Sequence, residues 1–359
     1  MAEARADVAS AVSAAHPSFA EVFSWIEARS LTPSRVGAAF GAVLSGAWTP
    51  VQIGAFAAAL RMHGESAETI VAAAEALRAV MTSVEHDHVE VVDTCGTGGD
   101  GAHTLNVSTA AAIVLAGAGC YVAKHGNRSV SSRCGSADVV DALGIPLDIE
   151  PARQHEVLRS ARIAFLMAPA HHPALRHAAQ ARRELGLRTI FNALGPLVNP
   201  ARATHQLVGV YDDALRPVMA AALGRLGVKR AWVVRSEDGL DEISPSSPTR
   251  VSVLENGAVT ERIVMPSDFG VAPIDLDGLR GGDAPGNAAA IVSILGGDDH
   301  PALAAVILNA AAALSLVRSD DLRACAEEVR AVIATGRAKA AFEGWHREAR
   351  RVREAKERT

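Results

Sequence analysis

Two polar segments of this chain have the residue types and spacing of a binding site for an anionic ligand. The first, residues 94–103 (TCGTGGDGAH), holds four glycines between an apolar strand pattern and an apolar helix pattern. Glycine lets the backbone adopt positive φ and approach a ligand closely. The N–H groups of such a turn then meet the partial positive charge of the helix start. The segment therefore suits phosphate.

The second segment, residues 124–136 (KHGNRSVSSRCGS), adds side-chain donors. Lys124 and Arg128 are cationic, and the serines that follow would find little use in an apolar core. Glycine content alone leaves a flexible surface turn as an equal alternative, because the first segment is neither a P-loop nor the G-x-G-x-x-G dinucleotide motif. The second segment favours the ligand site, with Lys124 and Arg128 donating from a loop.

Short motifs extend this pattern along most of the chain. They are, in order, GTGGD, NVST, KHGNR, GSAD, HHPA, RRELGLRT, FNALGPLVNP and GLDEISP. One of them alone would be weak, but the ordered set resembles the anthranilate phosphoribosyltransferases. The resemblance implies a magnesium-dependent enzyme of tryptophan biosynthesis, which transfers the phosphoribosyl group from 5-phosphoribosyl 1-pyrophosphate to the amine of anthranilate and releases pyrophosphate.

The resemblance also implies which residues touch the two substrates. Anthranilate would contact Gly96, Asn127 and Arg182, and an arginine fork suits its planar carboxylate. The residues expected to contact phosphoribosyl pyrophosphate are Gly96, Gly99, Asp100, Thr104, Asn106, Val107, Ser108, Thr109, Lys124, His125, Gly126, Asn127, Arg128, Ser129, Val130, Ser131, Ser132 and Ser136.

Asp241 and Glu242 are adjacent carboxylates in the GLDEISP motif. Adjacent acids in a loop are more often simply solvated. Mg²⁺, however, is typically held by one or two carboxylates together with substrate phosphates. The resemblance implies that Asp241 and Glu242 hold magnesium, as two ions, with the Ser108 hydroxyl contributing to one of them.

The implied reaction is a displacement at an anomeric carbon through an oxocarbenium-like transition state. It demands orientation of two substrates and neutralisation of the departing pyrophosphate. Magnesium, Lys124 and the N–H groups of the glycine turn meet these demands, so no protein nucleophile is expected. His125 and His172 would line the site without being required as acid or base.

Composition limits the alternatives. The chain has 359 residues, of which 49% are hydrophobic and 21% charged, which suits one large or two ordinary globular domains. A net charge of −5 argues against a general nucleic-acid surface. The cysteines show no metal or disulfide spacing, and the N-terminus lacks a signal-peptide core, so a cytoplasmic protein is expected. The uncharged residues 105–123 are expected to form a buried helix and strand.

Residues 19–83 have helical apolar spacing, with Thr32, Thr49 and Ser66 as N-caps. The chain then alternates strands and helices, which predicts a mostly parallel sheet with ligands at its carboxyl edge. We expect a small all-helical domain (1–86), joined through residues 190–205 as a hinge, and a nucleoside phosphorylase/phosphoribosyltransferase-like α/β domain (87–359). Expected strands are 89–93, 121–123, 163–167, 206–210 and 231–235, with a hairpin of 250–254 and 259–264 around Asn256-Gly257. The resemblance implies a homodimer through helices.

Two rival functions remain open. A pyrimidine-nucleoside phosphorylase shares this architecture and a glycine-rich phosphate loop, but it would use free phosphate without paired magnesium carboxylates. Asp241, Glu242 and Arg182 argue against it. A non-enzymatic nucleic-acid-binding relative should have lost ligand residues and gained a basic surface. Neither change is evident in the sequence.

Overall fold

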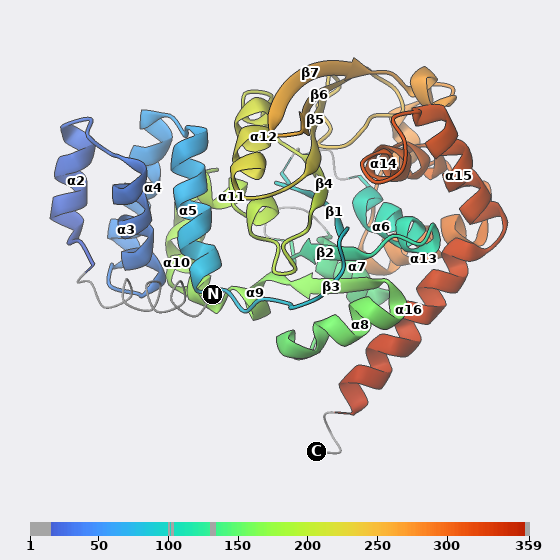
Figure 1. Cartoon of the computed structure of the whole chain (residues 1–359), viewed down its shortest axis with the longest axis horizontal. Helices are drawn as coiled ribbons and strands as arrows, with labels where there is room; N and C mark the ends of the chain where they lie inside the picture. Colours follow the sequence, from blue (N-terminus) through green and yellow to red (C-terminus); the bar gives the residue numbers. More distant parts are fainter. Residues whose placement is uncertain (1–15, 100, 102–103, 130–133, 356–359) are drawn as a thin grey trace. The chain divides into compact units, whose positions relative to one another are not determined.

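The computed structural model describes residues 16–99, 101, 104–129 and 134–355 (Figure 1). Asp100, Val130, Ser131 and Ser132, expected in the substrate site, lie outside this part of the chain. Contacts divide the chain into two units, and each is described by itself. One consists of Met1–Val80 and Ala174–Phe191, and the other of Met81–Pro173 and Asn192–Thr359.

The first unit is entirely helical in its described part. Thr32, Thr49 and Ser66 each accept a backbone N–H from the first turn of the following helix, as predicted for N-caps. Phe40 packs against both Phe56 and Phe191 in its core. The helices are α2 (Phe19–Glu27), α3 (Pro33–Leu44), α4 (Pro50–His63), α5 (Ala67–Ala79) and α10 (Arg176–Leu185).

The position of α10 differs from the sequence prediction. Sequence order assigns residues 174–189 to the α/β part, whereas α10 packs against α4 and α3 of the helical unit. Ala178 and Ala181 on its apolar face are buried there. Helical spacing shows that α10 has an apolar face, but it does not show which neighbour covers that face.

The second unit is built on a seven-stranded sheet of order β3-β2-β1-β4-β5-β6-β7. The first five strands in this order are parallel, and β6 and β7 add an antiparallel edge. Asn256 (φ 51°) and Gly257 (φ 76°) form the turn of the β6–β7 hairpin, as predicted. The strands are β1 (Val92–Gly96), β2 (Val122–Gly126), β3 (Ile163–Met167), β4 (His205–Gly209), β5 (Arg230–Ser236), β6 (Thr249–Glu255) and β7 (Ala258–Val264).

Apolar helices cover the sheet. Helix α6 packs on β1 and β2 and also contacts α14 and α16 (Figure 1). No described helix is long and apolar enough to cross a membrane, and residues 105–123 contain α6 and the start of β2. The helices of this unit are α6 (Val107–Gly117), α7 (Ser136–Ala142), α8 (Gln154–Ala161), α9 (Ala168–His171), α12 (Leu215–Arg225), α13 (Ala284–Gly296), α14 (Leu303–Ser315), α15 (Leu322–Ala334) and α16 (Arg337–Glu354), with short 3₁₀ turns η1 (Pro151–Arg153), η3 (Gly195–Val198), η4 (Pro266–Phe269) and η5 (Leu276–Leu279). Helix α11 (Ile190–Ala193) and the 3₁₀ turn η2 (Pro173–Leu175) each contain residues of both units.

The first two strands begin and end later than predicted. The sequence places them at residues 89–93 and 121–123, but β1 pairs with β4 up to Gly96↔Gly209 and β2 pairs with β3 up to Gly126↔Met167. Pairing with these neighbours carries both strands into the glycine- and lysine-containing motifs. Lys124 and His125 are therefore strand residues, and the prediction that Lys124 donates from a loop is wrong.

Candidate functional site

The carboxyl ends of β1 and β4 form the topological switch point of the sheet. The chain leaves β1 towards β2 and β3 on one side, and β4 then continues on the other side. Ligands of open α/β sheets bind at such a point, outside the carboxyl ends of the strands. Gly96 ends β1 and Gly209 ends β4, side by side in the ladder. The predicted glycine turn therefore begins at the position where a ligand is expected.

The loop that carries Asp241 packs directly on these two glycines. A Cβ atom at Gly96 would lie 2.9 Å from Asp241 Oδ2, and one at Gly209 would lie 1.6 Å from the Asp241 carbonyl oxygen. No side chain fits in that space. Gly96 and Gly209 thus make room for the Asp241 carboxylate at the switch point, although Asp241 lies far from Gly96 along the chain.

The glycine turn has the backbone conformation that the sequence predicts. Gly98 (φ 65°), Gly99 (φ 81°) and Gly101 (φ 78°) all lie in the left-handed region, which side-chain-bearing residues rarely adopt. Thr97 ties the start of the turn to β4, because its N–H donates to Gly209 O at 2.9 Å. The turn is thus held to the same strand end as the Asp241 loop.

Lys124 lies inside the protein, with 1% of its surface exposed. Its ammonium group donates to Thr94 O at 2.5 Å and to Ser108 Oγ at 3.2 Å. Burial lowers the pKa of Lys124, while the charges of Asp93 and Glu242 act in the opposite direction. Lys124 thus joins the end of β1 to the start of α6, and it orients the Ser108 hydroxyl.

Side chains replace the backbone ladder between β1 and β2 beyond Val92↔Val122, the one register pair described for these strands. Asp93 Oδ1 accepts the His125 N–H at 3.2 Å. Asn199 donates from Nδ2 to Asp93 Oδ2 and to Ala123 O, both at 2.8 Å. Residue 199 is therefore fixed to the α/β unit. The hinge expected at residues 190–205 stays a prediction.

The start of α6 contributes the next group of predicted site residues. Asn106 occupies the N-cap position without making a side-chain cap, and its Nδ2 donates instead to Cys134 O at 3.4 Å. Asn287 Nδ2 donates to Asn106 Oδ1 at 3.0 Å. Val107 and Thr109 are buried, whereas Thr104 pairs with Arg280 in an isolated bridge. Asn106 thus ties α6 to the second predicted loop and to α13, so capping alone does not explain it.

Asp138 on α7 joins the two described ends of the second predicted loop. Its Oδ2 accepts the N–H groups of Ser129 at 3.1 Å and Gly135 at 2.9 Å. Arg128 donates to Asp138 Oδ1 at 2.9 Å and to Asp141 Oδ2 at 3.0 Å. Arg128 is therefore exposed and ion-paired in this structure, and its charge is directed towards α7.

Asn127 and Ser136 close the same loop. Ser136 Oγ donates to Asn127 O at 3.4 Å, and the Asn127 side chain accepts the Arg128 N–H at 2.8 Å. A Cβ atom at Gly126 would lie 2.3 Å from Ser136 Oγ, so this glycine permits close packing at the end of β2. Gly126, Asn127 and Ser136, three predicted residues in the described part of this segment, therefore lie together.

Two histidines pack beside the strand ends. The rings of His125 and His172 are 5.1 Å apart, and His125 Nδ1 lies 3.0 Å from Gly195 O. Burial, followed by the charge of neighbouring histidines, lowers the pKa of His125 to about 3 and that of His172 to about 4. Burial thus favours the neutral form of both rings at pH 7.

Asp241 and Glu242 suit a magnesium ion whose remaining ligands come from substrate phosphates and water. No group of three or more His, Cys, Asp or Glu side chains suited to a metal occurs in the described part of the chain. Mg²⁺ does not need such a cage, because phosphates and water fill most of its coordination sphere. The Asp241 carboxylate beside Gly96 places a hard oxygen at the strand ends, and the charge of Glu242 counteracts the lowering of the Lys124 pKa by burial.

Arg182 belongs to the helical unit, where it lies on α10. Its guanidinium carbon is 5.8 Å from the centre of the Phe191 ring. Burial alone lowers its pKa, and no described carboxylate is paired with it. A partly dehydrated guanidinium of this kind favours an anionic partner with a planar carboxylate.

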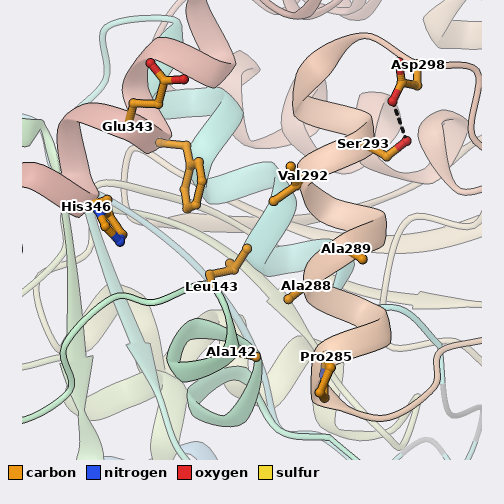
Figure 2. A pocket seen from close by; sticks show the side chains of 11 residues that line it. Ala142, Leu143, Pro285, Ala288, Ala289, Val292, Ser293, Asp298, Glu343 and His346 are labelled. Carbon is orange, nitrogen blue, oxygen red and sulfur yellow. Dashed lines mark hydrogen bonds between the residues drawn. The ribbon is translucent and has the colours of Figure 1, made fainter.

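An apolar hollow of about 760 Å³ elsewhere in the α/β unit contains none of the predicted site residues. It lies between α7, α13 and α16, with Leu143 and Val292 on its walls (Figure 2). Ser293 donates to Asp298 at 2.8 Å at one end. The hollow has no cluster of donors for a phosphate, so it does not compete with the switch point as the candidate site.

Four residues that shape the site were not singled out from the sequence. Asp93, Asn199 and Asn309 are buried polar side chains, and Gly209 is the glycine under Asp241. Each of the three polar residues stands within or beside an apolar run, where burial is costly without hydrogen bonds. That cost is the signal that could have identified them, although the sequence does not name their partners.

Comparison with known proteins identifies the class. The chain matches the family described as "Glycosyl transferase family, a/b domain" over residues 88–339 and "Glycosyl transferase family, helical bundle domain" over residues 25–81. Fold and site thus define a two-domain glycosyltransferase. The chain is 48% identical to an anthranilate phosphoribosyltransferase of Myxococcus xanthus, and the match covers 87% of this chain and 93% of that protein. The chain belongs to the anthranilate phosphoribosyltransferase family.

Solved structures agree with this assignment. The anthranilate phosphoribosyltransferase of Thermus thermophilus superposes with a TM-score of 0.87 at 36% identity, covering 92% of this chain and 99% of that one. The Saccharomyces cerevisiae enzyme, solved in complex with PRPP and Mg, superposes with a TM-score of 0.85 at 26% identity, covering 93% of this chain and 99% of that one. The predicted fold class and family are confirmed.

Proposed function

We propose that this protein transfers the 5-phosphoribosyl group of phosphoribosyl pyrophosphate to the amine of anthranilate. A bond forms between the anthranilate nitrogen and the anomeric carbon, and the bond from that carbon to the pyrophosphate oxygen breaks. The amine's proton passes to the departing pyrophosphate or to solvent. The observation that carries the proposal is the Asp241 loop seated on Gly96 and Gly209 at the switch point. It brings a carboxylate to the strand ends from which the glycine turn begins.

The chain's own groups would bind and orient the phosphoribosyl substrate. Backbone N–H groups of the glycine turn and the first turn of α6 offer donors to phosphate oxygens. Lys124 holds the Ser108 hydroxyl at 3.2 Å and adds a buried positive charge behind it. Effective electrostatic stabilisation requires groups that are in place before pyrophosphate departs, and the bonds of Lys124 to Thr94 and Ser108 fix its ammonium group in this way.

Asp241, Glu242 and Ser108 are proposed to hold magnesium, as two ions. Bound magnesium would neutralise the charge that develops on the departing pyrophosphate. The yeast structure with PRPP and Mg supports the ion's involvement. In this chain, the Asp241 carboxylate beside Gly96 at the end of β1 supports the proposed metal site.

A homodimer and a cytoplasmic location complete the proposal. Exposed apolar side chains on the helical unit support association through helices, and they are Phe23, Val51, Met62, Val80 and Leu187. Gel filtration with light scattering would measure the mass. The free cysteines fit a reducing compartment.

The function is tested by the loss of anthranilate fluorescence with phosphoribosyl pyrophosphate and Mg²⁺. We expect consumption of anthranilate with equal release of pyrophosphate, and no reaction when either the sugar diphosphate or the metal is omitted. Phosphorolysis of a pyrimidine nucleoside, measured in parallel, tests the rival enzyme. Nucleoside cleavage without anthranilate consumption would replace the proposed function by that activity.

Arg182→Ala is expected to weaken the use of anthranilate and to spare phosphoribosyl pyrophosphate. Loss of a charge-assisted fork to a carboxylate should raise the KM for anthranilate about tenfold or more. Arg183→Ala is the matched control, because Arg183 is the exposed neighbour on the same helix. Steady-state kinetics with each substrate varied in turn would decide, and an equal loss for both substrates would assign Arg182 a structural role.

A further inference from the structure

Asn309 is a buried amide in a helix that is otherwise almost wholly apolar. Helix α14 contacts strand β4 of the sheet (Figure 1). Nearly all of its side chains are buried. Asn309 has 0% of its surface exposed. An amide in such a place destabilises the fold unless its hydrogen-bonding groups find partners. The hydrogen-bond partners of Asn309 therefore indicate the role of this residue.

Those partners lie in the loop that carries the two carboxylates. Asn309 Oδ1 accepts the Ile243 N–H at 2.9 Å, and its Nδ2 donates to Ile243 O at 3.0 Å. The second Nδ2 hydrogen goes to Ala305 O within α14, at 2.9 Å. Both backbone groups of the residue after Glu242 are thus clamped by one side chain.

The opposite end of the same loop is clamped as well. Ser236, the last residue of β5, accepts the Leu240 N–H at 2.9 Å and donates from its own N–H to Leu240 O at 3.1 Å. Asp241 and Glu242 lie between these two clamps, with the Asp241 backbone resting on Gly209. Strand β5 and helix α14, which are distant from each other in the sequence, therefore hold the backbone on either side of the two carboxylates.

We propose that Asn309 is a positioning residue for the Asp241–Glu242 pair, and so for the metal-chelated diphosphate that this pair is proposed to bind. This inference rests on the proposed function. Asn309 touches neither substrate, and it acts by holding the Ile243 backbone. Supporting hydrogen bonds of this kind hold ligating oxygens in place to within a fraction of an ångström.

The test compares Asn309→Leu and Asn309→Asp with Ser315→Ala. Leucine keeps the volume and loses both bonds to Ile243, and aspartate keeps the shape but turns a carboxylate oxygen towards Ile243 O. Ser315 is a buried polar residue on the same helix, and its hydroxyl donates to Ala312 O within that helix at 2.8 Å. It therefore controls for loss of a polar group from α14.

Binding of phosphoribosyl pyrophosphate with Mg²⁺ is measured by calorimetry without anthranilate, so that the readout does not depend on turnover. Both Asn309 variants should bind about tenfold or more weakly, since small displacements at a site have effects of this size. The KM for anthranilate at saturating diphosphate should stay within about twofold, as should all constants of Ser315→Ala. Wild-type binding by the Asn309 variants, or an equal loss in Ser315→Ala, would overturn the proposal.

A mutant cycle separates this inference from the function on which it rests. In a background of Asp241→Asn with Glu242→Gln, the Asn309 substitutions should have little further effect, because the groups they displace are already disabled. Additive losses would assign Asn309 a purely structural role. If the double variant itself kept normal magnesium dependence, the proposed metal site would fail first. If it lost that dependence while Asn309 variants bound normally, only the role of Asn309 would fail.

Discussion

Replacing Asp241 by Asn and Glu242 by Gln together should reduce kcat/KM about 10²- to 10³-fold and raise the magnesium concentration needed for half-maximal activity. The substitutions keep the shape of both side chains and remove only their charge. A magnesium ion held by one or two carboxylates loses most of its protein ligands in such a variant. Loss of one electrostatic stabiliser of a departing group has an effect of this size in other enzymes.

Glu237→Gln provides the control for lost negative charge near the same loop. Glu237 is exposed and pairs with Arg250 at 3.4 Å, an interaction worth little in water. Its kinetics should match those of the unchanged protein. Magnesium titrations at fixed phosphoribosyl pyrophosphate give the comparison. A double variant with an unaltered magnesium requirement would remove Asp241 and Glu242 from the site.

Gly209→Ala should nearly abolish activity although it adds only a methyl group. The new Cβ would lie 1.6 Å from the Asp241 carbonyl oxygen and 2.6 Å from its carbonyl carbon, so one of the two segments must move. Overpacking costs about 1–3 kcal/mol of stability, and more where backbone is the obstacle. Movement of Asp241 by about 1 Å should lower turnover about a hundredfold.

Gly296→Ala is the matched control, because Gly296 ends α13 and a Cβ atom there would meet nothing within 4 Å apart from its chain neighbours and its own helix backbone. It should leave activity unchanged and should not lower stability, because alanine is favoured over glycine in a helix. Chemical denaturation separates loss of fold from loss of function in Gly209→Ala. Wild-type turnover by a folded Gly209→Ala protein would contradict the close packing of the Asp241 loop on β4.

Local features of this fold could be predicted from local sequence. The caps at Thr32, Thr49 and Ser66 follow from a hydroxyl that meets the N–H groups of the next turn. The Asn256-Gly257 turn follows from the backbone conformations that these two residues tolerate. Strand β3 has the predicted bounds, Ile163–Met167, because its apolar residues are bounded by clear breaks. In each case the deciding interaction lies within a few residues.

The candidate site was predicted as a set of residues, but its geometry was not. Strands β1 and β2 run further than expected because pairing with β4 and β3 extends them. That extension takes Lys124 out of a loop and into the core, where Thr94 and Ser108 bind its ammonium group. The strand propensity of the residues near Lys124 does not reveal this extension, because it depends on pairing with β3, which lies about 40 residues further along the chain.

The sequence by itself determined the family, the α/β class with its helical N-terminal part, and the glycine turn whose positive φ values only glycine adopts easily. Tertiary structure alone decided that Gly209 lies under Asp241 and that Asn309 holds Ile243. Both depend on groups brought together from strands and helices distant in the chain. Hydrogen bonds and excluded volume act at a few ångströms in space, whatever the separation along the sequence.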